Sequence, residues 1–437
     1  MTNALTRFAV AALFLGAFIP AESVVCAERA EPGDKGDAVV NAAEFAGPES
    51  PTGGLQEAVD ALPASGGVVN VPAGQYVLRQ CIQVRSQVTL QGVGGSAVLR
   101  SAKQAVSRLA APADRGATTV RVVDAGQFRE LDEVGLKDKD SVGWNIAHAI
   151  VKGIKGDELL LDRRLPRAFD PAKDGVVFAG FPAITGNNIS QVVIRDLVID
   201  GHSGNEDKPT THVDPGFTFA AIHLVEATDS RVDGCWIRDW SGDGVSLQRG
   251  AGNAVLRCRI QNCRGNGLHP GGGLRDSTFS ENVVRGCGGE GLYFCAGVRH
   301  VVVSGNIFTG NKGNGIGALG DNGDKYNIVA NNVCEANGGN GIWLFDGDSN
   351  TVTGNVCLNN SQSEAGRYSG ILLNQTADTI VAQNRCLDDQ KTRTQKHGIL
   401  EFSSCRANVF ANNQCRGNAD AGLVLKGAHS QQSGNAE

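Results

Sequence analysis

The chain has 437 residues, a formal net charge of −6, 58 glycines and an aromatic fraction of 5%. The glycine share is about twice the usual one, which is typical of a chain with many tight turns and a thin core. The acidic balance argues against nucleic acid as a partner, and the sequence carries no phosphate loop, dinucleotide-binding fingerprint or nucleic-acid-binding module.

Residues 1–27 have the pattern of a secretory signal peptide. Arg7 precedes an apolar run from Phe8 to Phe18, and Val25-Cys26-Ala27 stands before Glu28. The run is too short to span a membrane, so we expect export to the periplasm or the medium. A lipoprotein site at Cys26 is the alternative. An unstructured leader is expected at residues 28–50.

Residues 51–102 predict a cap and the first coils of a solenoid. The stretch from Thr52 to Leu62 is amphipathic and helix-forming, and the segment from Gly66 to Tyr76 and the phrase VTLQGVG at residues 88–94 follow it. These segments resemble the N-terminal cap of pectate-lyase-like β-helices. The resemblance implies that one helix covers the exposed edge of the first coil. It speaks to fold and not to chemistry.

Residues 103–180 interrupt this pattern. They predict a small antiparallel β unit with turns at Gly126, Gly156 and Asp157, inserted between early coils. The insertion serves either as a substrate clamp or as structural padding.

A polar insertion at residues 201–219 follows, and we expect it to project over one face of the solenoid. It leads into the strand that carries His223, and its titratable residues are His202, Glu206, Asp207, His212 and Asp214.

From Gly244 to Gly422 one short phrase recurs: a small or polar residue, a glycine, then a branched aliphatic residue. The recurring glycines are 23 to 29 residues apart, by subtraction of their numbers: Gly244, Gly267, Gly291, Gly315, Gly341, Gly370, Gly398 and Gly422. A period of this length is typical of solenoids. An Asn stands about nine residues before the glycine, as in Asn282, Asn306 and Asn332.

Between these landmarks the apolar residues alternate with a period of two, which indicates strands. We therefore predict an all-β fold, a right-handed parallel β-helix over residues 181–430 with about three short strands in each coil, and a polar tail at residues 431–437. Stacked Asn and aliphatic side chains are expected to form ladders along its axis. Leucine-rich and ankyrin-type repeats are excluded, because the leucine pattern and the helices that define them are missing.

Cysteines fall in the repeat columns. Cys235 and Cys258 share one column, Cys263 and Cys287 share another, and Cys334, Cys357, Cys386 and Cys415 each follow a ladder Asn by two residues. We interpret them as small buried hydrophobes stacked coil on coil. Since neighbouring coils lie roughly 4.8 Å apart, a disulfide between Cys263 and Cys287 is the alternative for an exported protein.

The glycine register predicts side-chain direction. The residue after the glycine points inward, and the next one points outward, because strand side chains alternate. The outward column contains His223, Ser246, His269, Tyr293, Gly317, Trp343, Leu372 and Leu400. We expect these side chains to line one exposed face, with Asp243 and Glu290 at the entry of the same strands and Gln248 two residues beyond the column.

Such a face suits an extended acidic polysaccharide. Turnover of a uronic acid needs a neutralised carboxylate, a base for the C5 proton, and an acid for the leaving oxygen or the opposite face. We predict His269, Tyr293, His223 and Asp243 as catalytic residues. Arg249, Arg275 and Arg299 are predicted carboxylate ligands. Glu290, Trp343 and Gln248 complete the predicted substrate contacts.

The first functional hypothesis is thus a secreted polysaccharide lyase or C5-epimerase that acts as a monomer. The second is a glycoside hydrolase that uses Asp243 and Glu290. The third is a carbohydrate-binding protein without catalysis. No cofactor is predicted with certainty. Ca²⁺ remains an alternative, because Asp321, Asp324, Asp346 and Asp348 crowd two adjacent turns and Asp207 and Asp214 lie in the polar insertion.

Overall fold

The computed structural model describes residues 38–437 except 48, 103–104, 202–215 and 321–322. The chain divides into two units, Met1–Asp37 and Ala38–Glu437, and the second contains all the described elements. The expected signal peptide, the polar residues His202, Glu206, Asp207, His212 and Asp214, and also Asp321, lie outside the described residues. None of the helices within the described residues has the length and apolar content that a membrane crossing requires.

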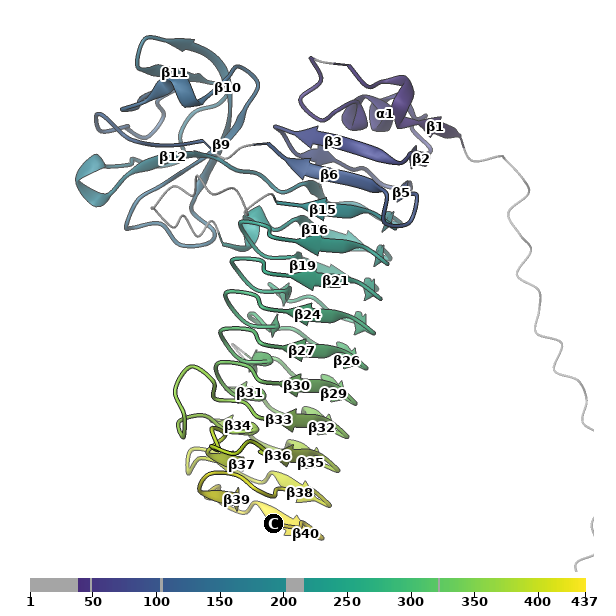
Figure 1. Cartoon of the computed structure of the whole chain (residues 1–437), viewed down its shortest axis with the longest axis vertical. Coiled ribbons are helices and arrows are strands. Elements are labelled where there is room, and N and C mark those ends of the chain that lie inside the picture. The colour runs from purple at the N-terminus through teal and green to yellow at the C-terminus, as the bar shows by residue number, and fades with distance from the viewer. Residues whose placement is uncertain (1–37, 48, 103–104, 202–215, 321–322) are drawn as a thin grey trace, which may run out of the picture. The chain divides into compact units, whose positions relative to one another are not determined.

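The second unit is built around a right-handed parallel β-helix, as predicted (Figure 1). Most coils contribute one short strand to each of three parallel sheets among the described residues, which we name A, B and C.

Sheet A consists, in order, of β1 (Val39–Asn41), β2 (Gly67–Val71), β5 (Val88–Gly92), β14 (Val193–Arg195), β17 (Arg231–Asp233), β20 (Ala254–Leu256), β23 (Thr278–Ser280), β26 (Val302–Ser304), β29 (Ile328–Ala330), β32 (Thr351–Thr353), β35 (Ile380–Ala382), β38 (Val409–Ala411) and β40 (Gln431–Ser433). Sheet B consists of β3 (Gly74–Leu78), β6 (Ala97–Ser101), β15 (Val198–Asp200), β18 (Trp236–Arg238), β21 (Arg259–Gln261), β24 (Val283–Arg285), β27 (Ile307–Thr309), β30 (Val333–Glu335), β33 (Val356–Leu358) and β36 (Arg385–Leu387). Sheet C consists of β4 (Ile82–Gln83), β13 (Ile184–Asn187), β16 (Ile222–Thr228), β19 (Val245–Ala251), β22 (Leu268–Gly271), β25 (Leu292–Tyr293), β28 (Ile316–Leu319), β31 (Ile342–Phe345), β34 (Ile371–Asn374), β37 (His397–Glu401) and β39 (Ala421–Val424).

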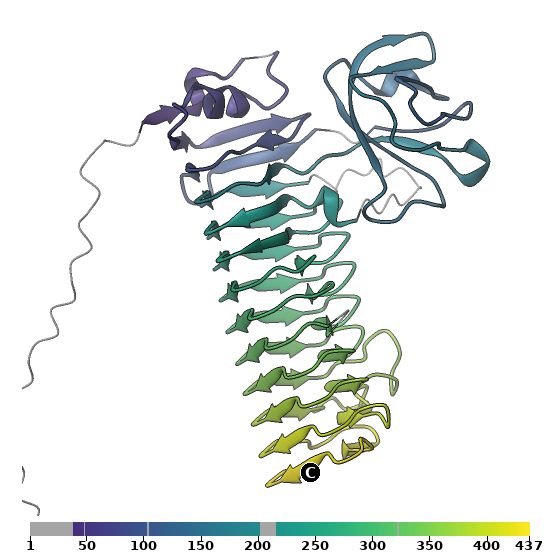
Figure 2. The ribbon, with the colours of Figure 1, turned by 180° about the vertical axis from the view of Figure 1, so that it is seen from behind.

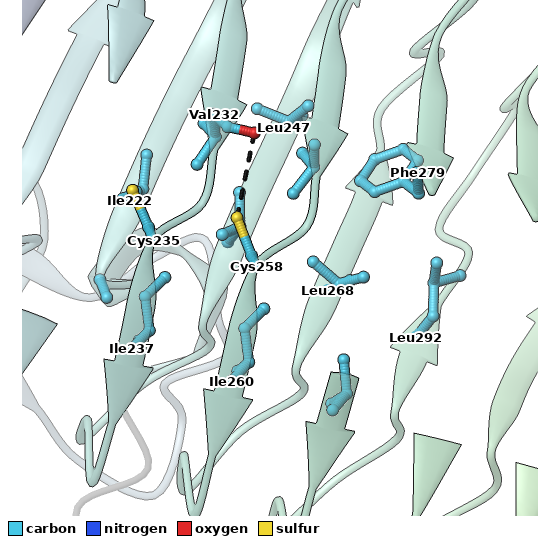
Figure 3. Packing of buried hydrophobic residues seen from close by; sticks show 14 of the residues in the cluster. Ile222, Val232, Cys235, Ile237, Leu247, Cys258, Ile260, Leu268, Phe279 and Leu292 are labelled. Carbon is cyan, nitrogen blue, oxygen red and sulfur yellow. Dashed lines mark hydrogen bonds between the residues drawn. The ribbon is translucent and has the colours of Figure 1, made fainter. Parts of the chain in front are cut away.

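The core of the β-helix is a set of stacked aliphatic columns. Val245 pairs with Leu268, Leu268 with Leu292, and Leu292 with Ile316, each directly after its repeat glycine. These side chains are fully buried, which confirms the inward half of the predicted register. Figure 3 shows neighbouring columns of the same core, with the Cys258 thiol directed at the Val232 carbonyl oxygen of the preceding coil.

Ladders of Asn connect the later coils. Asn306 Oδ1 accepts hydrogen bonds from both the backbone N–H and the side-chain amide of Asn282, each at 2.9 Å, and the pattern continues through Asn332 and Asn355. Each buried amide thereby satisfies a backbone donor that faces away from solvent. Cys258 donates its N–H to Asn282 and begins this ladder.

The cysteines of the described chain are free thiols, among them Cys263 and Cys287, which are both buried. The structure therefore has stacked thiols where a disulfide was the alternative. A side-chain contact with Cys287 and burial both raise the pKa of the Cys263 thiol well above its usual range.

A helical cap covers the first coil. α1 (Leu55–Ala61) buries Leu55, Ala58 and Val59, which confirms the helix predicted within residues 52–62. Residues 39–44 of the expected unstructured leader are structured, because β1 pairs in parallel with β2 and is followed by the 3₁₀ turn η1 (Ala42–Glu44). At the other end, β40 pairs with β38, so the residues expected to form a polar tail add a strand to sheet A.

The insertion is a separate antiparallel sheet with strand order β7 (Val106–Arg108), β12 (Val176–Ala179), β9 (Glu133–Lys137), β10 (Ala147–Lys155), β11 (Glu158–Leu161) and β8 (Thr119–Arg121). It has its own apolar core, around residues such as Val134, Ala149 and Phe169. It also carries two 3₁₀ turns, η2 (Ala125–Gln127) and η3 (Pro171–Lys173). Figures 1 and 2 show it at the same end of the β-helix as the cap.

Candidate functional site

The predicted outward column lies along sheet C. His223 pairs with Ser246 and Ser246 with His269, and Tyr293, in the strand after His269, pairs with Gly317. Trp343 occupies the same position further along, where it pairs with Leu372. A register shift between β28 and β31 separates these two groups. The repeat glycine thus marks equivalent points, and the structure brings His223, His269 and Tyr293 together on one side of sheet C.

The two histidines are buried, although we expected them to be exposed. His223 is 8% and His269 is 4% exposed. The ring of Phe217, in the 3₁₀ turn η4 (Phe217–Phe219), lies 6.0 Å from the His223 ring and 5.2 Å from the His269 ring. The Tyr293 ring meets His269 edge to face at 5.1 Å. Phe217 therefore covers part of the column that sheet C alone would leave open.

Asp243 holds His269. Its Oδ2 lies 2.7 Å from His269 Nδ1, and its Oδ1 accepts the backbone N–H of Asn266 at 2.7 Å. Burial by itself would lower the pKa of His269, but the Asp243 hydrogen bond and charge outweigh it, helped by the thiol of Cys295, and raise the pKa to about 9. The raised pKa favours the imidazolium form of His269 at neutral pH. The buried Nε2 makes no hydrogen bond with a described residue.

His223 has the opposite character. Burial lowers its pKa to about 4, and the neighbouring His148 and His269 act in the same direction. Its buried Nδ1 has no hydrogen-bond partner among the described residues. The face therefore carries a neutral imidazole at His223 and a protonated one at His269. Environments that push the pKa values of two groups apart in this way are typical of acid and base pairs.

An outer ladder explains where Asp243 and Glu290 stand. The residue before each repeat glycine accepts the backbone N–H of the equivalent residue in the next coil, from Asp243 to Asn266, Glu290, Asn314 and Asn340. Two of these positions hold a carboxylate in place of an amide. An Asn side chain could accept the same backbone hydrogen bonds. The ladder itself therefore does not require the two carboxylates.

Glu290 reaches over the column. Its carboxylate accepts hydrogen bonds from the backbone and the side-chain amide of Asn314. Burial raises its pKa to about 7 against these two bonds. A Cβ at Gly317 would lie 2.8 Å from the Glu290 carboxyl carbon, so only glycine leaves room for the carboxylate there. Glu290 therefore lies next to the Tyr293 position on the same face.

A groove of about 660 Å³ runs over this face. Its walls include His223, Gln248 and Tyr293 from sheet C, Phe217 from η4, and Trp144 from the insertion. Cys295 and Arg249 also line it. Gln248 Nε2 donates to Ser246 Oγ at 3.0 Å, and Arg249 forms an exposed pair with Glu226 at 3.1 Å. His269 and Asp243 lie behind these residues.

The other predicted contacts do not join the groove. Arg275 and Arg299 are exposed and bridge successive coils beyond the end of sheet C, where Arg275 pairs with Asp276 at 2.7 Å. The Trp343 ring lies tilted beside the Phe345 ring, with 5.5 Å between the ring centroids, past the register shift. Sequence reasoning missed Trp144, Phe217 and Cys295. Cys295 could have been found, because it occupies the same repeat position as Gln248. Trp144 and Phe217 could not, because they come from insertions whose path the repeat does not define.

Two of the residues suggested for Ca²⁺, Asp324 and Asp348, make contacts within the protein. Asp324 is fully buried and accepts the backbone N–H groups of Val298 and Gly320 at 2.6 and 2.9 Å. Asp348 pairs with Lys325 at 3.2 Å. No group of three or more His, Cys, Asp or Glu side chains that could hold a metal ion exists within the described residues.

Known proteins share this fold at low identity. A family model for the right handed beta helix region matches residues 180–324 and 275–436. The A-module of mannuronan C-5 epimerase AlgE6 from Azotobacter vinelandii is 17% identical with a TM-score of 0.57, over 91% of this chain and 98% of that one. The family 28 exopolygalacturonase of Yersinia enterocolitica is 12% identical with a TM-score of 0.57, over 92% and 78%.

A third structure is the enzymatically active domain of tailspike protein 2 from bacteriophage CBA120, 12% identical with a TM-score of 0.56, over 90% of this chain and 51% of that one. No curated protein matches the sequence. The similarity therefore concerns the fold.

Proposed function

The chain belongs to the right-handed β-helix family, and from this premise we propose that it is an exported enzyme that removes the C5 proton of a uronic-acid polysaccharide. The observation that carries the proposal is the pair of histidines on one face of sheet C with opposite pKa shifts, about 4 for His223 and about 9 for His269. The solved structures with this fold include proteins named as an epimerase and an exopolygalacturonase of such glycans.

In the proposed reaction Arg249 binds the substrate carboxylate. Its guanidinium is 60% exposed at the groove wall and presents a planar fork that matches a carboxylate. Neutralising that carboxylate acidifies the C5 proton. Gln248, which also lines the groove, orients the sugar hydroxyls.

His223 acts as the base, because it is neutral at the pH where the reaction runs and it lines the groove. The C–H electrons move into the carboxylate as an enolate. The imidazolium of His269, fixed by Asp243, stabilises that negative charge from behind the groove. Tyr293 then donates a proton. In elimination the enolate electrons form a C4=C5 double bond, the bond from C4 to the glycosidic oxygen breaks, and that leaving oxygen takes the proton. In epimerisation the C4–O bond stays intact and C5 takes the proton from the opposite face.

The test is to incubate the protein with alginate, polygalacturonate, glucuronan and hyaluronan in D₂O. Epimerisation places deuterium at C5, and elimination gives an unsaturated end that absorbs in the ultraviolet. We expect one of the two on at least one polymer, with loss in the Tyr293→Phe variant. Neither signal on any polymer would refute the proposal.

Hydrolysis is the second candidate, favoured by one observation: the pKa of Glu290 is raised to about 7 by burial, as a general acid requires. Its partner Asp243 has both oxygens engaged by His269 and Asn266, which leaves it poorly placed to activate water. New reducing ends without ultraviolet absorbance, lost in Glu290→Gln, would support hydrolysis. Retention of a glycan with neither product would support the carbohydrate-binding alternative.

A further inference from the structure

Trp144 is the most conspicuous apolar side chain on the surface. It is 74% exposed, the largest exposed fraction among the exposed large hydrophobics of the described residues. It belongs to the loop between β9 and β10 of the insertion and lines the groove together with Phe217, Tyr293 and Arg249. Trp side chains are enriched at binding surfaces, because the ring offers a large apolar face, so its place at a groove wall makes Trp144 a candidate ligand contact.

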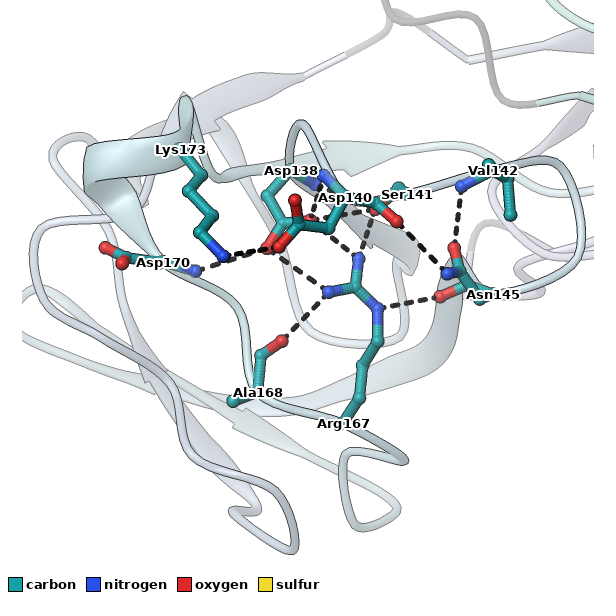
Figure 4. A network of polar contacts seen from close by, with 9 residues as sticks. All are labelled: Asp138, Asp140, Ser141, Val142, Asn145, Arg167, Ala168, Asp170 and Lys173. Atoms are coloured by element: carbon teal, nitrogen blue, oxygen red, sulfur yellow. Dashed lines mark hydrogen bonds and ion pairs between the residues drawn. The ribbon is translucent and has the colours of Figure 1, made fainter.

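The loop is held rigidly on its insertion side. Arg167 donates to both carboxylate oxygens of the buried Asp138, at 3.2 and 2.8 Å, and to Ser141 Oγ. Its Nε donates to the backbone oxygen of Asn145, directly after Trp144, at 3.2 Å. Figure 4 shows this network, in which Asn145 Oδ1 also accepts the Val142 N–H. The bidentate pair fixes the loop geometrically.

The same loop is attached to the β-helix on its other side. Thr218 Oγ1 donates to the backbone oxygen of Gly143, directly before Trp144, at 3.2 Å. A Cβ at Gly216 would lie 2.7 Å from the Gly143 Cα, so the two glycines allow a close backbone approach. Both chain neighbours of Trp144 are therefore held by hydrogen bonds. Asn145 is bound by Arg167 of the insertion, and Gly143 is bound by Thr218, which follows Phe217.

From these contacts we infer that Trp144 is a sugar-stacking residue, and that the insertion forms one wall of the glycan-binding groove. The occupant is a pyranose ring of an acidic glycan: its C–H face packs on the indole while its carboxylate reaches Arg249. This inference rests on the proposed function for its substrate class. It assigns a binding role to Trp144, within an insertion that the sequence alone left as either a clamp or padding.

The experiment measures the binding of hexamers of mannuronate, guluronate, galacturonate and glucuronate to the full chain by isothermal titration. We expect Trp144→Ala to weaken binding of the preferred hexamer about tenfold or more, as central aromatic contacts do. Trp144→Phe keeps a smaller ring and should lose roughly threefold. Val142→Ala is the matched control, because Val142 is an exposed apolar residue of the same loop at 43%, and it should bind as the wild type does.

Arg167→Met tests the anchoring. Methionine keeps an apolar contact with Phe169, over whose ring the guanidinium lies at 4.0 Å, but it releases Asp138 and Asn145. We expect binding to weaken by less than in Trp144→Ala while the unfolding midpoint of the β-helix is unchanged. Equal affinities of Trp144→Ala and Val142→Ala would overturn the inference.

The outcomes separate this inference from the proposed function. Binding that depends on Trp144, with no deuterium incorporation and no unsaturated product, would support the sugar-stacking role of Trp144. The same result would refute the proposed removal of the C5 proton. Turnover at low substrate concentration that Trp144→Ala leaves unchanged would refute the stacking role alone. Failure of all four hexamers to bind the wild type would overturn both.

Discussion

Sheet C is one continuous scaffold with two different outer faces. In the half from β16 to β28 the column contains His223, His269 and Tyr293, and Phe217 and the insertion cover it. In the half from β31 to β37 the same column contains Trp343, Leu372 and Leu400, all half-buried. The inward aliphatic residues continue through both halves, across the register shift between β28 and β31.

The ladders differ between the halves as well. The outer ladder has carboxyl side chains at Asp243 and Glu290. The equivalent positions in the next coils hold the uncharged residues Asn314, Asn340 and Ser369. The two carboxylates thus occupy repeat positions where Asn already suffices for the ladder.

His269→Ala should have the largest effect. Loss of the imidazolium removes the charge that stabilises the enolate, and we expect turnover to fall by about 10²–10³-fold, measured as deuterium incorporation or unsaturated product. His397→Ala is the control, because His397 lies in the same sheet, is 7% exposed and stands in the other half. Equal losses in the two variants would show that the halves do not differ in function.

Asp243→Asn converts the first carboxylate into the ladder residue of the other coils. The amide oxygen still accepts the Asn266 N–H, so the fold should persist, but burial then acts on His269 without an opposing charge and its pKa should fall below the usual value. We expect turnover at neutral pH to fall roughly ten- to hundredfold, with the alkaline limb of the pH profile moved to lower pH. An NMR titration of His269 with an unchanged pKa of about 9 would contradict this.

The two histidines should give stability an optimum near pH 6.5. The pKa of His269 is raised to about 9, so its contribution is complete below the unfolded value and is lost as pH rises through 9. The pKa of His223 is lowered to about 4, so the unfolded state binds a proton more readily. Stability therefore falls as the pH drops from the unfolded value towards 4. We expect ~3 kcal/mol on either side from these two groups, measured by urea unfolding across pH 4–9.

The matched comparison for that optimum is the double variant His223→Gln/His269→Gln, in which both limbs should flatten. A wild-type curve without an optimum, or an optimum that survives in the double variant, would assign the pH dependence to other groups.

Gly317→Ala should have the smallest effect. The new methyl group would meet the Glu290 side chain at 2.8 Å, so Glu290 must move, at a cost of about 1–3 kcal/mol in the free energy of unfolding. Gly94→Ala is the control, because a Cβ there has nothing within 4 Å and the backbone suits any residue. If the two variants unfold at the same urea concentration, the space above Gly317 is not reserved for Glu290.

Much of the fold follows from the sequence, because the repeat glycine fixes both the coil period and the direction of each side chain. The inward positions of Val245, Leu268 and Leu292 could be read directly, as could the cap helix. The contact between Asp243 and His269 was also within reach, since a carboxylate among ladder amides stands one residue before the glycine and His269 stands two after the next.

The coverage of the site could not be predicted in the same way. Phe217 and Trp144 reach the groove from segments without a repeat, and their position depends on a single bond from Thr218 to Gly143 and on the Arg167 network. Periodicity gives no information about such contacts. For this reason the histidines were expected in solvent. Their opposite pKa shifts, which come from burial at His223 and from Asp243 at His269, therefore remained hidden.

The Asn ladders make the scaffold modular. Asn332 offers the same acceptor to the coil before it that Asn355 offers to Asn332, so removing one complete turn rejoins identical donors and acceptors. Duplication or deletion of a whole turn in the later half therefore changes the reach of the molecule in fixed increments, while the residues that surround His223 and His269 keep every neighbour they have.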